Sequence, residues 1–293
     1  MYGFRTGVGD GFCPASGNGA GGQGCVKREY RLLLKKMIQF IDTHAHLYDE
    51  AFDGDLDEVV GKIKGAGVAR CILPAIDSES FGRQQAVAAK YGEFTPQAMG
   101  LHPTSVGENW KDELDFALGE LDKGGYIAVG EIGVDGYWSR DFIEQQKEAF
   151  RVQMEAAYKK GLPVIIHVRE ATDEVFQVLD SLGGCIPRGV FHAFSGSWET
   201  YDRISRYGSF MVGIGGVVTY KNAGVAKSIE KIPLERIVLE TDCPYLTPVP
   251  MRGKRNDSSY LAYIAEKIAQ VKGVTLEEVA AVTTANAKEM FVL

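Results

Sequence analysis

The residues of this chain that are able to bind metal follow apolar, strand-like runs. All five histidines lie at or near the ends of such runs, and a glutamate and an aspartate hold equivalent places in two others; the set is His44, His46, His102, His167, His192, Glu131 and Asp242. An imidazole or carboxylate buried without a partner costs several kcal/mol. Divalent cations are suitable partners, because imidazole and carboxylate are common metal ligands. The pattern therefore predicts a metal site.

Strand alternation groups these residues further, because every second residue of a strand points to the same side. His44 and His46 share this parity, so both are able to bind one ion from the same strand. The other pairs with matching parity are Glu131 with Asp135, His167 with Arg169, and Glu240 with Asp242. A lone His-x-His motif also fits a buried structural histidine, but the agreement of six strand ends favours one shared centre.

The elements that position these residues alternate in a regular way. From Met37 onward, β-branched runs and amphipathic helical stretches follow one another, and the predicted strands lie near 38–46, 69–76, 95–102, 126–132, 163–169, 189–195, 209–215 and 236–242. Eight such cycles in about 250 residues predict a single-domain α/β fold, a TIM-type (β/α)8 barrel. An open doubly wound sheet is the alternative. The barrel is favoured because all its strands end at one face, where the polar residues then meet.

The first 36 residues have a different composition from the rest. Nine of the first 25 are glycine, and no apolar periodicity is present. The segment lacks the apolar core of a secretory signal and is too rich in glycine for an amphipathic transit helix. We expect residues 1–36 to be a disordered or non-native extension, and residues 37–293 to form the barrel.

Composition limits the classes of function. The chain has 293 residues, of which 45% are hydrophobic, and a net charge of -7. This charge argues against indiscriminate binding of nucleic acid through a broad basic surface. The five cysteines lack CxxC spacing, which predicts neither a disulfide framework nor a thiolate zinc site and fits a reducing cytoplasm. No apolar run approaches the roughly 20 residues that span a bilayer, so we expect no membrane association. The sequence also indicates no obligate protein partner.

Several motifs together resemble the TatD family of metal-dependent deoxyribonucleases, which is related to the amidohydrolase barrels. The motifs are FIDTHAHL (40–47), GLHP (100–103), VGEIGVD (129–135), IIHVREA (165–171), FHAFSG (191–196), ETDCPYLTP (240–248) and PMRGKRN (250–256). The resemblance runs from Met37 to the C-terminus. One departure is Ala193, at a position where cysteine is common in the family, and this position is not a ligand.

The resemblance implies two divalent metal ions, for which zinc, manganese and magnesium are all candidates. The first ion is expected to be held by His44, His46 and Asp242, and the second by His167 and His192, with Glu131 as a bridge between them. Histidines and carboxylates together suit several divalent metals, so the ligand types do not select one.

The expected chemistry follows from this ligand set. Two cations about 3.5 to 4 Å apart that share a carboxylate lower the pKa of a water between them and stabilise charge on a transferring phosphoryl group. We expect Glu131 and Asp242 to be the catalytic residues, with Asp242 also a candidate general base. Related barrels use a modified lysine as the bridge on the fourth strand. A glutamate stands there in this chain, which disfavours an amide hydrolase.

Three residues are predicted to bind substrate. His102 is expected to contact a substrate phosphate or support a ligand, although a structural histidine or a ligand of a third metal also fits. Arg169 is able to hold a phosphate through two hydrogen bonds, or to pair with a loop carboxylate. Arg252, together with Lys254 and Arg255, either attracts a phosphate backbone or forms solvated ion pairs.

Other residues near the strand ends have supporting roles in this interpretation. Asp42 and Glu240 are expected to orient ligand histidines through their free ring nitrogens. Four aromatic residues on predicted loops either stack nucleobases or cap the barrel, namely Tyr137, Trp138, Phe194 and Tyr245.

The sequence as a whole predicts a metal-dependent hydrolase of the TatD type. Its expected activity is that of a 3'-5' exonuclease-like deoxyribonuclease acting on single-stranded DNA ends. One alternative is hydrolysis of another ester, in an aminoacyl-tRNA or a phosphomonoester, because this barrel supports many chemistries. Another is a catalytically silent metal-binding barrel, which is disfavoured because no expected ligand is missing.

Overall fold

The computed structural model describes residues 38–293, so the expected extension over residues 1–36 lies outside the described part of the chain. Eight short parallel strands follow one another in chain order. They are β1 Phe40–Asp42, β2 Val68–Cys71, β3 Ala98–Met99, β4 Ala128–Asp135, β5 Val164–Arg169, β6 Gly189–Phe191, β7 Phe210–Ile214 and β8 Ile237–Leu239. All eight coincide with predicted strands but are mostly shorter, because residues beyond the ladder turn into loops.

The strands form a two-stranded sheet, β1 and β2, and a six-stranded sheet, β3 to β8. Backbone contacts join these two sheets into a ring. A bridge from Leu73 to Gln97 connects β2 with β3, and a bridge from Ala45 to Cys243 joins the segments that follow β1 and β8. The backbone N–H of Thr43 also donates to the carbonyl of Leu239 over 3.0 Å. The chain order and this closure confirm the (β/α)8 barrel and exclude an open doubly wound sheet.

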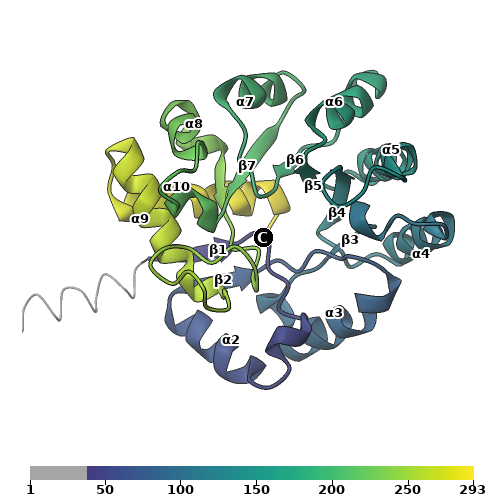
Figure 1. The fold of residues 1–293 in the computed structure, drawn as a ribbon. Coiled ribbons are helices and arrows are strands. Elements are labelled where there is room, and N and C mark those ends of the chain that lie inside the picture. The colour runs from purple at the N-terminus through teal and green to yellow at the C-terminus, as the bar shows by residue number, and fades with distance from the viewer. Residues whose placement is uncertain (1–37) are drawn as a thin grey trace, which may run out of the picture. The chain divides into compact units, whose positions relative to one another are not determined.

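Helices surround the strands (Figure 1). Their bounds are α2 Leu56–Gly65, α3 Ser78–Tyr91, α4 Trp110–Lys123, α5 Ile143–Lys160, α6 Thr172–Ser181, α7 Trp198–Ser205, α8 Val225–Lys231, α9 Leu261–Lys272 and α10 Leu276–Phe291. Helix α3 begins where Asp77 accepts the N–H of Ser80, and α5 ends at Gly161 in the left-handed conformation. No helix in the described range is long and apolar enough to cross a membrane.

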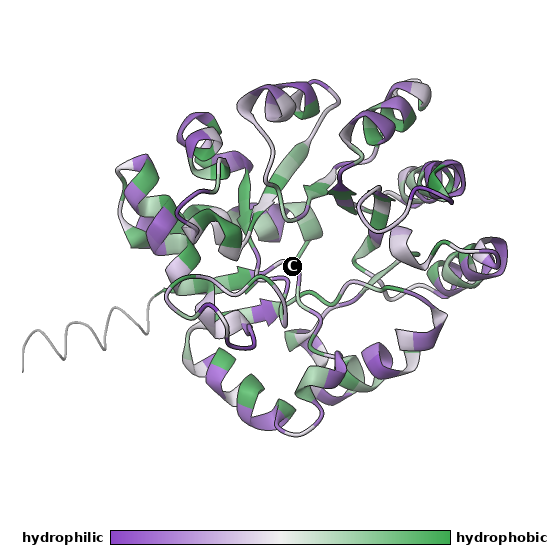
Figure 2. Ribbon diagram, in the orientation of Figure 1, coloured by the Kyte–Doolittle hydropathy of each residue, from purple (hydrophilic) through white to green (hydrophobic). Residues whose placement is uncertain are grey.

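The N-terminal end of the barrel is closed by helix α10. One interior layer takes a residue from each strand or its immediate end, and Ala287, Met290 and Phe291 of α10 pack against it; the layer is Ile41, Ile72, Ala98, Ala128, Ile165, Val190, Met211 and Val238. Figure 1 accordingly shows the C-terminus near the middle of the ring. In Figure 2 the strands are mostly hydrophobic and the outer helices are mixed. The other end of the barrel is left for the polar residues.

Strand alternation explains why several polar residues at the mouth of the barrel point to its axis. On β5, Ile165 is part of the interior layer, so His167, two residues later, also faces the axis. The same step leads from Val190 to His192 beside β6. Two segments depart from this alternation: His44 and His46, beyond the end of β1, do not share the parity of Ile41, and on β4 the register shifts between Val129 and Ile132. The shift allows Glu131 to point to the axis although strict alternation from the interior layer would turn it away.

Candidate metal centre

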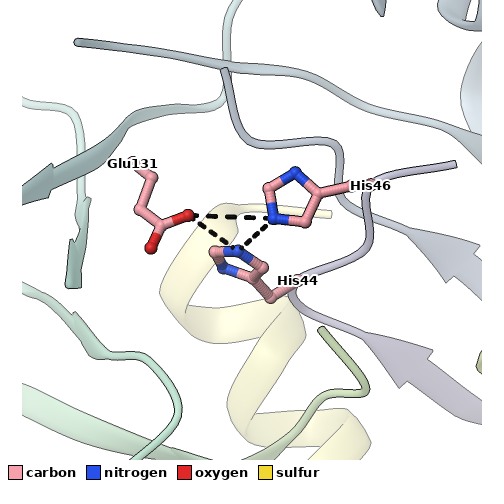
Figure 3. A group of neighbouring side chains, drawn as sticks. All are labelled: His44, His46 and Glu131. Carbon is pink, nitrogen blue, oxygen red and sulfur yellow. Dashed lines mark hydrogen bonds and ion pairs between the residues drawn. The ribbon is translucent and has the colours of Figure 1, made fainter. Parts of the chain in front are cut away.

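The two histidines after β1 converge on one point. His44 and His46 stand in the segment that bridges to the end of β8, and their Nε2 atoms lie 3.1 Å apart. Glu131 approaches both from β4, with Oε2 at 3.0 Å from His44 Nε2 and 3.9 Å from His46 Nε2. Figure 3 shows the three side chains directed toward one another. These three residues meet the spacing of a metal-binding group.

Asp242 completes this first set of ligand atoms. Its Oδ1 lies 3.6 Å from His44 Nε2 and 3.3 Å from His46 Nε2. A tetrahedral ion with ligands at about 2.0–2.2 Å requires ligand atoms about 3.3–3.6 Å apart. The separations run from 3.0 to 3.9 Å and scatter around this range, so the two imidazoles and two carboxylates surround a space close in size to that required by one divalent ion.

Glu131 is shared between two groups of histidines. While Oε2 faces His44 and His46, Oε1 lies 2.8 Å from His167 Nδ1, 3.1 Å from His192 Nε2 and 3.3 Å from His102 Nε2. The side chain is almost completely buried, with 2% of its surface exposed. Glu131 is thus the one described residue whose two oxygens reach both sides of the cluster.

Hydrogen bonds at His46 and His167 restrict where the ring hydrogens of these two histidines lie. The hydroxyl of Tyr48 donates to the Pro74 carbonyl over 2.6 Å, so it accepts from His46 Nδ1 at 2.9 Å. His167 Nε2 donates to Asp135 Oδ2 over 2.8 Å. In neutral His46 the lone pair therefore points into the cluster, whereas His167 lies between two carboxylates, with its Nδ1 also 2.8 Å from Glu131 Oε1. At His167 a lone pair faces a carboxylate oxygen, an arrangement that requires a cation or a proton between them.

His192 is positioned by a second carboxylate. Its Nδ1 lies 3.3 Å from Glu240 Oε1, while Nε2 faces Glu131. Glu240 also accepts the backbone N–H of Ala193. The sequence predicts that Glu240 lies next to a free ring nitrogen of a ligand histidine, and in the structure it lies next to Nδ1 of His192.

His102 differs from His46 in the ring nitrogen that holds the hydrogen of the neutral imidazole. The backbone N–H of Thr104 donates to His102 Nδ1 over 3.1 Å, so the hydrogen of the neutral ring is on Nε2. Nε2 is therefore a donor toward Glu131 Oε1, and it does not offer a lone pair. Although His102, Glu131 and His167 are close enough to form a metal-binding group, this hydrogen bond favours a contact with substrate over metal ligation.

The structure corrects one supporting role and adds another. Asp42 does not contact an imidazole nitrogen; its carboxylate accepts the backbone N–H groups of His44 and Thr241 and the hydroxyl of Thr241. Burial raises the pKa of Asp42 to about 7 despite these hydrogen bonds. Asp135, which sequence reasoning gave no role, supports His167. Its shared parity with Glu131 on β4 was the available signal.

Electrostatics keep the central carboxylate ionised. Burial alone would raise the pKa of Glu131, but the imidazoles of His192, His44 and His102 outweigh burial and hold this pKa well below its ordinary value. Burial likewise opposes charge on His192, yet Glu131 and Glu240 raise the pKa of its imidazole well above the usual value. An anionic carboxylate among histidines is a suitable environment for a divalent cation.

A cavity of about 620 Å³ opens above the cluster. Its wall includes the proposed ligands His46, Glu131, His167, His192 and Asp242, and farther out Trp138, Arg169, Tyr245 and Leu246. The guanidinium carbon of Arg169 lies 3.5 Å from the Tyr137 ring centroid. No carboxylate in the described residues is within ion-pair distance of Arg169, so the expected alternative of a loop salt bridge is not observed.

Other predicted substrate contacts lie apart from the cluster. Arg252 is not part of the cavity wall, and its guanidinium carbon is 4.3 Å from the Tyr220 ring centroid. Arg255 forms an ion pair with Asp55 over 2.6 Å, in agreement with the alternative of solvated ion pairs. Phe194 is 8% exposed and belongs to the hydrophobic core, so it is not available to stack on a nucleobase, in agreement with the alternative that it caps the barrel.

Comparison with known proteins identifies the family. The model of the TatD-related DNase family matches residues 41–292. The chain belongs to this family. Uncharacterized metal-dependent hydrolase YabD of Bacillus subtilis is 39% identical to this TatD-family chain over 251 residues, which are 85% of this chain and 98% of that protein. The family is one of metal-dependent hydrolases, and the ligand atoms of the barrel suit that description.

Two further relatives extend the comparison. The 3'-5' ssDNA/RNA exonuclease TatD of Pantoea ananatis is 30% identical over 257 residues, which cover 85% of this chain and 98% of that protein. The crystal structure of YjjV, a TatD homologue from Escherichia coli, has a TM-score of 0.78 and 30% identity, and the match covers 88% of this chain and 99% of that one. The TatD fold is therefore shared over nearly the whole described range.

Proposed function

We propose that this TatD-family hydrolase is a deoxyribonuclease that removes nucleotides from single-stranded 3' ends. The observation that carries the proposal is Glu131, whose two carboxylate oxygens face two separate groups of histidines at the base of an open cavity. Shared carboxylates of this kind are typical of two-metal phosphodiesterases. The relative from Pantoea ananatis, named as a 3'-5' ssDNA/RNA exonuclease, supports the same substrate class.

The proposed ligand set has two parts. His44, His46 and Asp242 would hold one divalent ion and His167 and His192 the second, with Glu131 available to both. The lone pair of His46 that points into the cluster and the contact of His167 with Glu131 support this division. When bound, the ions polarise a water molecule and neutralise charge on the phosphoryl group. Zinc, manganese and magnesium are all candidates.

Asp242 is the proposed general base. Its side chain is 17% exposed, against 2% for Glu131, so solvent reaches it from the cavity. Burial opposes its ionisation, but His46, His192 and His44 together lower its pKa, so the carboxylate is ionised near neutral pH. An ionised carboxylate next to the attacking water is able to accept its proton.

Three residues are proposed to bind the substrate phosphates. In the substrate complex His102 redirects its Nε2 hydrogen from Glu131 Oε1 to a phosphoryl oxygen, and Arg169 presents its guanidinium from the cavity wall. Arg252, outside the wall, attracts the phosphate backbone at longer range only. Loss of Arg252 is therefore expected to affect substrate association more than turnover.

The test is degradation of end-labelled single-stranded DNA by the full chain. After chelation, magnesium, manganese or zinc is added back, and Asp242→Asn is compared with Asp112→Asn, which removes an exposed carboxylate on α4. The proposal predicts a metal-dependent ladder from the 3' end for the wild type and Asp112→Asn. For Asp242→Asn, turnover is expected to fall by about 10²- to 10⁴-fold.

The same preparation distinguishes the alternative esters. Intact DNA in every metal, with metal bound to the protein, would contradict the nuclease proposal. Hydrolysis of an aminoacyl-tRNA under those conditions would identify a deacylase, and release of inorganic phosphate from a nucleotide would identify a phosphomonoesterase. No turnover of any of the three, by a metal-loaded chain, would favour a catalytically silent barrel.

A further inference from the structure

Exposed apolar side chains gather at the mouth of the barrel. The large hydrophobic residues that remain exposed in residues 38–293 are Tyr137, Trp138, Tyr158, Tyr245, Leu246, Val249 and Val292. Five of these seven lie on the two loops that follow β4 and β8, and only Tyr158 and Val292 lie elsewhere. Three of the five line the cavity above the ligand cluster: Trp138, Tyr245 and Leu246.

The β4 loop carries two exposed aromatic rings, Tyr137 and Trp138. Trp138 is 71% exposed, and its ring meets that of Tyr137 edge to face at 4.9 Å between centroids. Arg169 lies over the Tyr137 ring at 3.5 Å and is 5.5 Å from the Trp138 ring. A guanidinium held over an aromatic ring keeps its N–H groups at the edge, where they are available for a phosphate.

These two rings are attached to the metal ligands through one carboxylate. Asp135 Oδ1 accepts the backbone N–H of Tyr137 over 2.9 Å and that of Trp138 over 3.4 Å. Its Oδ2 accepts from His167 over 2.8 Å. The aromatic loop and a proposed metal ligand are therefore held in fixed relation by the same side chain.

The β8 loop presents a second aromatic ring. Tyr245 is 53% exposed, its hydroxyl donates to Asp49 Oδ2 over 2.8 Å, and its side chain forms part of the cavity wall. The Tyr245 ring centroid is 6.4 Å from that of His46. Because β4 and β8 are four strands apart in a ring of eight, the two aromatic surfaces stand on opposite sides of the ligand cluster.

From this arrangement we infer that the cavity binds two consecutive nucleotides, with one base stacked on Trp138 and the other on Tyr245, and the cleaved phosphate between them. The inference rests on the proposed nuclease function. Aromatic rings stack on any base, so the two surfaces recognise single-stranded nucleic acid without reading its sequence. A phosphomonoester or a single aminoacyl group would occupy only one of the two surfaces.

The test measures cleavage of three short single-stranded oligonucleotides. One is complete, one lacks the base on the 5' side of the cleaved phosphate, and one lacks the base on the 3' side. Trp138→Ala and Tyr245→Ala are compared with Tyr158→Ala, an exposed aromatic on α5 outside the cavity. Loss of one stacking contact is expected to raise KM by roughly 5- to 150-fold. Tyr158→Ala is expected to match the wild type.

The decisive comparison combines protein and substrate changes. If a base contacts Trp138, removal of that base has no further effect on Trp138→Ala, and the same holds for the opposite base and Tyr245→Ala. Cleavage that is indifferent to the bases, or equal losses by each variant on all three substrates, would overturn this inference alone. Failure of the wild type to cleave any of the oligonucleotides would overturn the nuclease function, and the inference with it.

Discussion

At the scale of single residues, the site depends on which atoms of each side chain face the centre. Glu131 directs one oxygen to His44 and the other to His167. The hydrogen bond from Thr104 distinguishes His102, because it keeps the ring hydrogen on Nε2. The five histidines at the barrel mouth therefore differ in their hydrogen-bond partners, and these partners influence which ring nitrogen is able to bind a metal.

Replacement of the central carboxylate tests the proposed bridge. Glu131→Gln preserves shape but removes charge, so bound metal is expected to fall from about two ions to one or none, and turnover by ~10²-fold or more. Metal content by mass spectrometry, with circular dichroism as a check of folding, measures this. Glu266→Gln on the exposed face of α9 is the control. Full metal content in Glu131→Gln would refute the bridge.

The carboxylate beside His192 tests indirect positioning. Glu240→Gln keeps an acceptor for the Ala193 N–H but loses the charge at His192 Nδ1. We expect metal affinity, measured against a competing chelator, to fall about 10- to 100-fold. An unchanged affinity would mean that Glu240 has only a structural role.

At the scale of the elements, close packing between strands β7 and β8 positions Glu240. A Cβ on Gly213 of β7 would overlap the Glu240 carboxylate, so a side chain cannot be added there without displacing it. On β4, Gly133 has φ of 144°, and a Cβ would overlap the His167 carbonyl. Glycines at these two places allow the strands to carry polar side chains into the interior.

The glycine on β7 gives a prediction with an internal control. Gly213→Ala is expected to destabilise the fold by ~1–3 kcal/mol and to reduce metal affinity through Glu240. Gly119→Ala, in the middle of α4 with open space around it, is expected to stabilise by ~0.5–1 kcal/mol. Urea unfolding measures both. Equal effects of the two substitutions would contradict the role assigned to Gly213.

The sequence predicts the elements better than the details of the site. Hydrophobic periodicity locates all eight strands, and parity correctly indicates that His167 and Glu240 face the axis. Parity alone does not indicate that Arg252 lies outside the cavity wall or that Asp42 contacts backbone N–H groups, because loop paths set both. The register shift on β4 is also a property of packing between strands and leaves no pattern in the sequence.

At the scale of the whole molecule, the two ends of the barrel differ in the residues that fill them. Helix α10 and one apolar layer close the N-terminal end, whereas buried histidines and carboxylates meet at the other. Grouping many ionisable residues at one buried place costs stability in the absence of compensating charge. Metal binding is therefore expected to stabilise the whole fold.

This coupling predicts a thermal shift. A ligand present at 100 times its Kd adds ~2.7 kcal/mol per site, which corresponds to roughly 5–10 °C in a domain of this size. Differential scanning calorimetry of the chelated and metal-loaded chain measures it. Asp242→Asn is expected to reduce the shift, since it removes one ligand atom of the first set. Equal melting temperatures with and without metal would contradict the coupling.

We expect two ions to share the carboxylate of Glu131. Anomalous X-ray diffraction from crystals of the manganese-loaded protein tests this sharing. Two anomalous peaks are expected, one beside Glu131 Oε2 with His44 and His46, and one beside Oε1 with His167 and His192. A single peak away from Glu131, or none inside the barrel, would contradict this sharing.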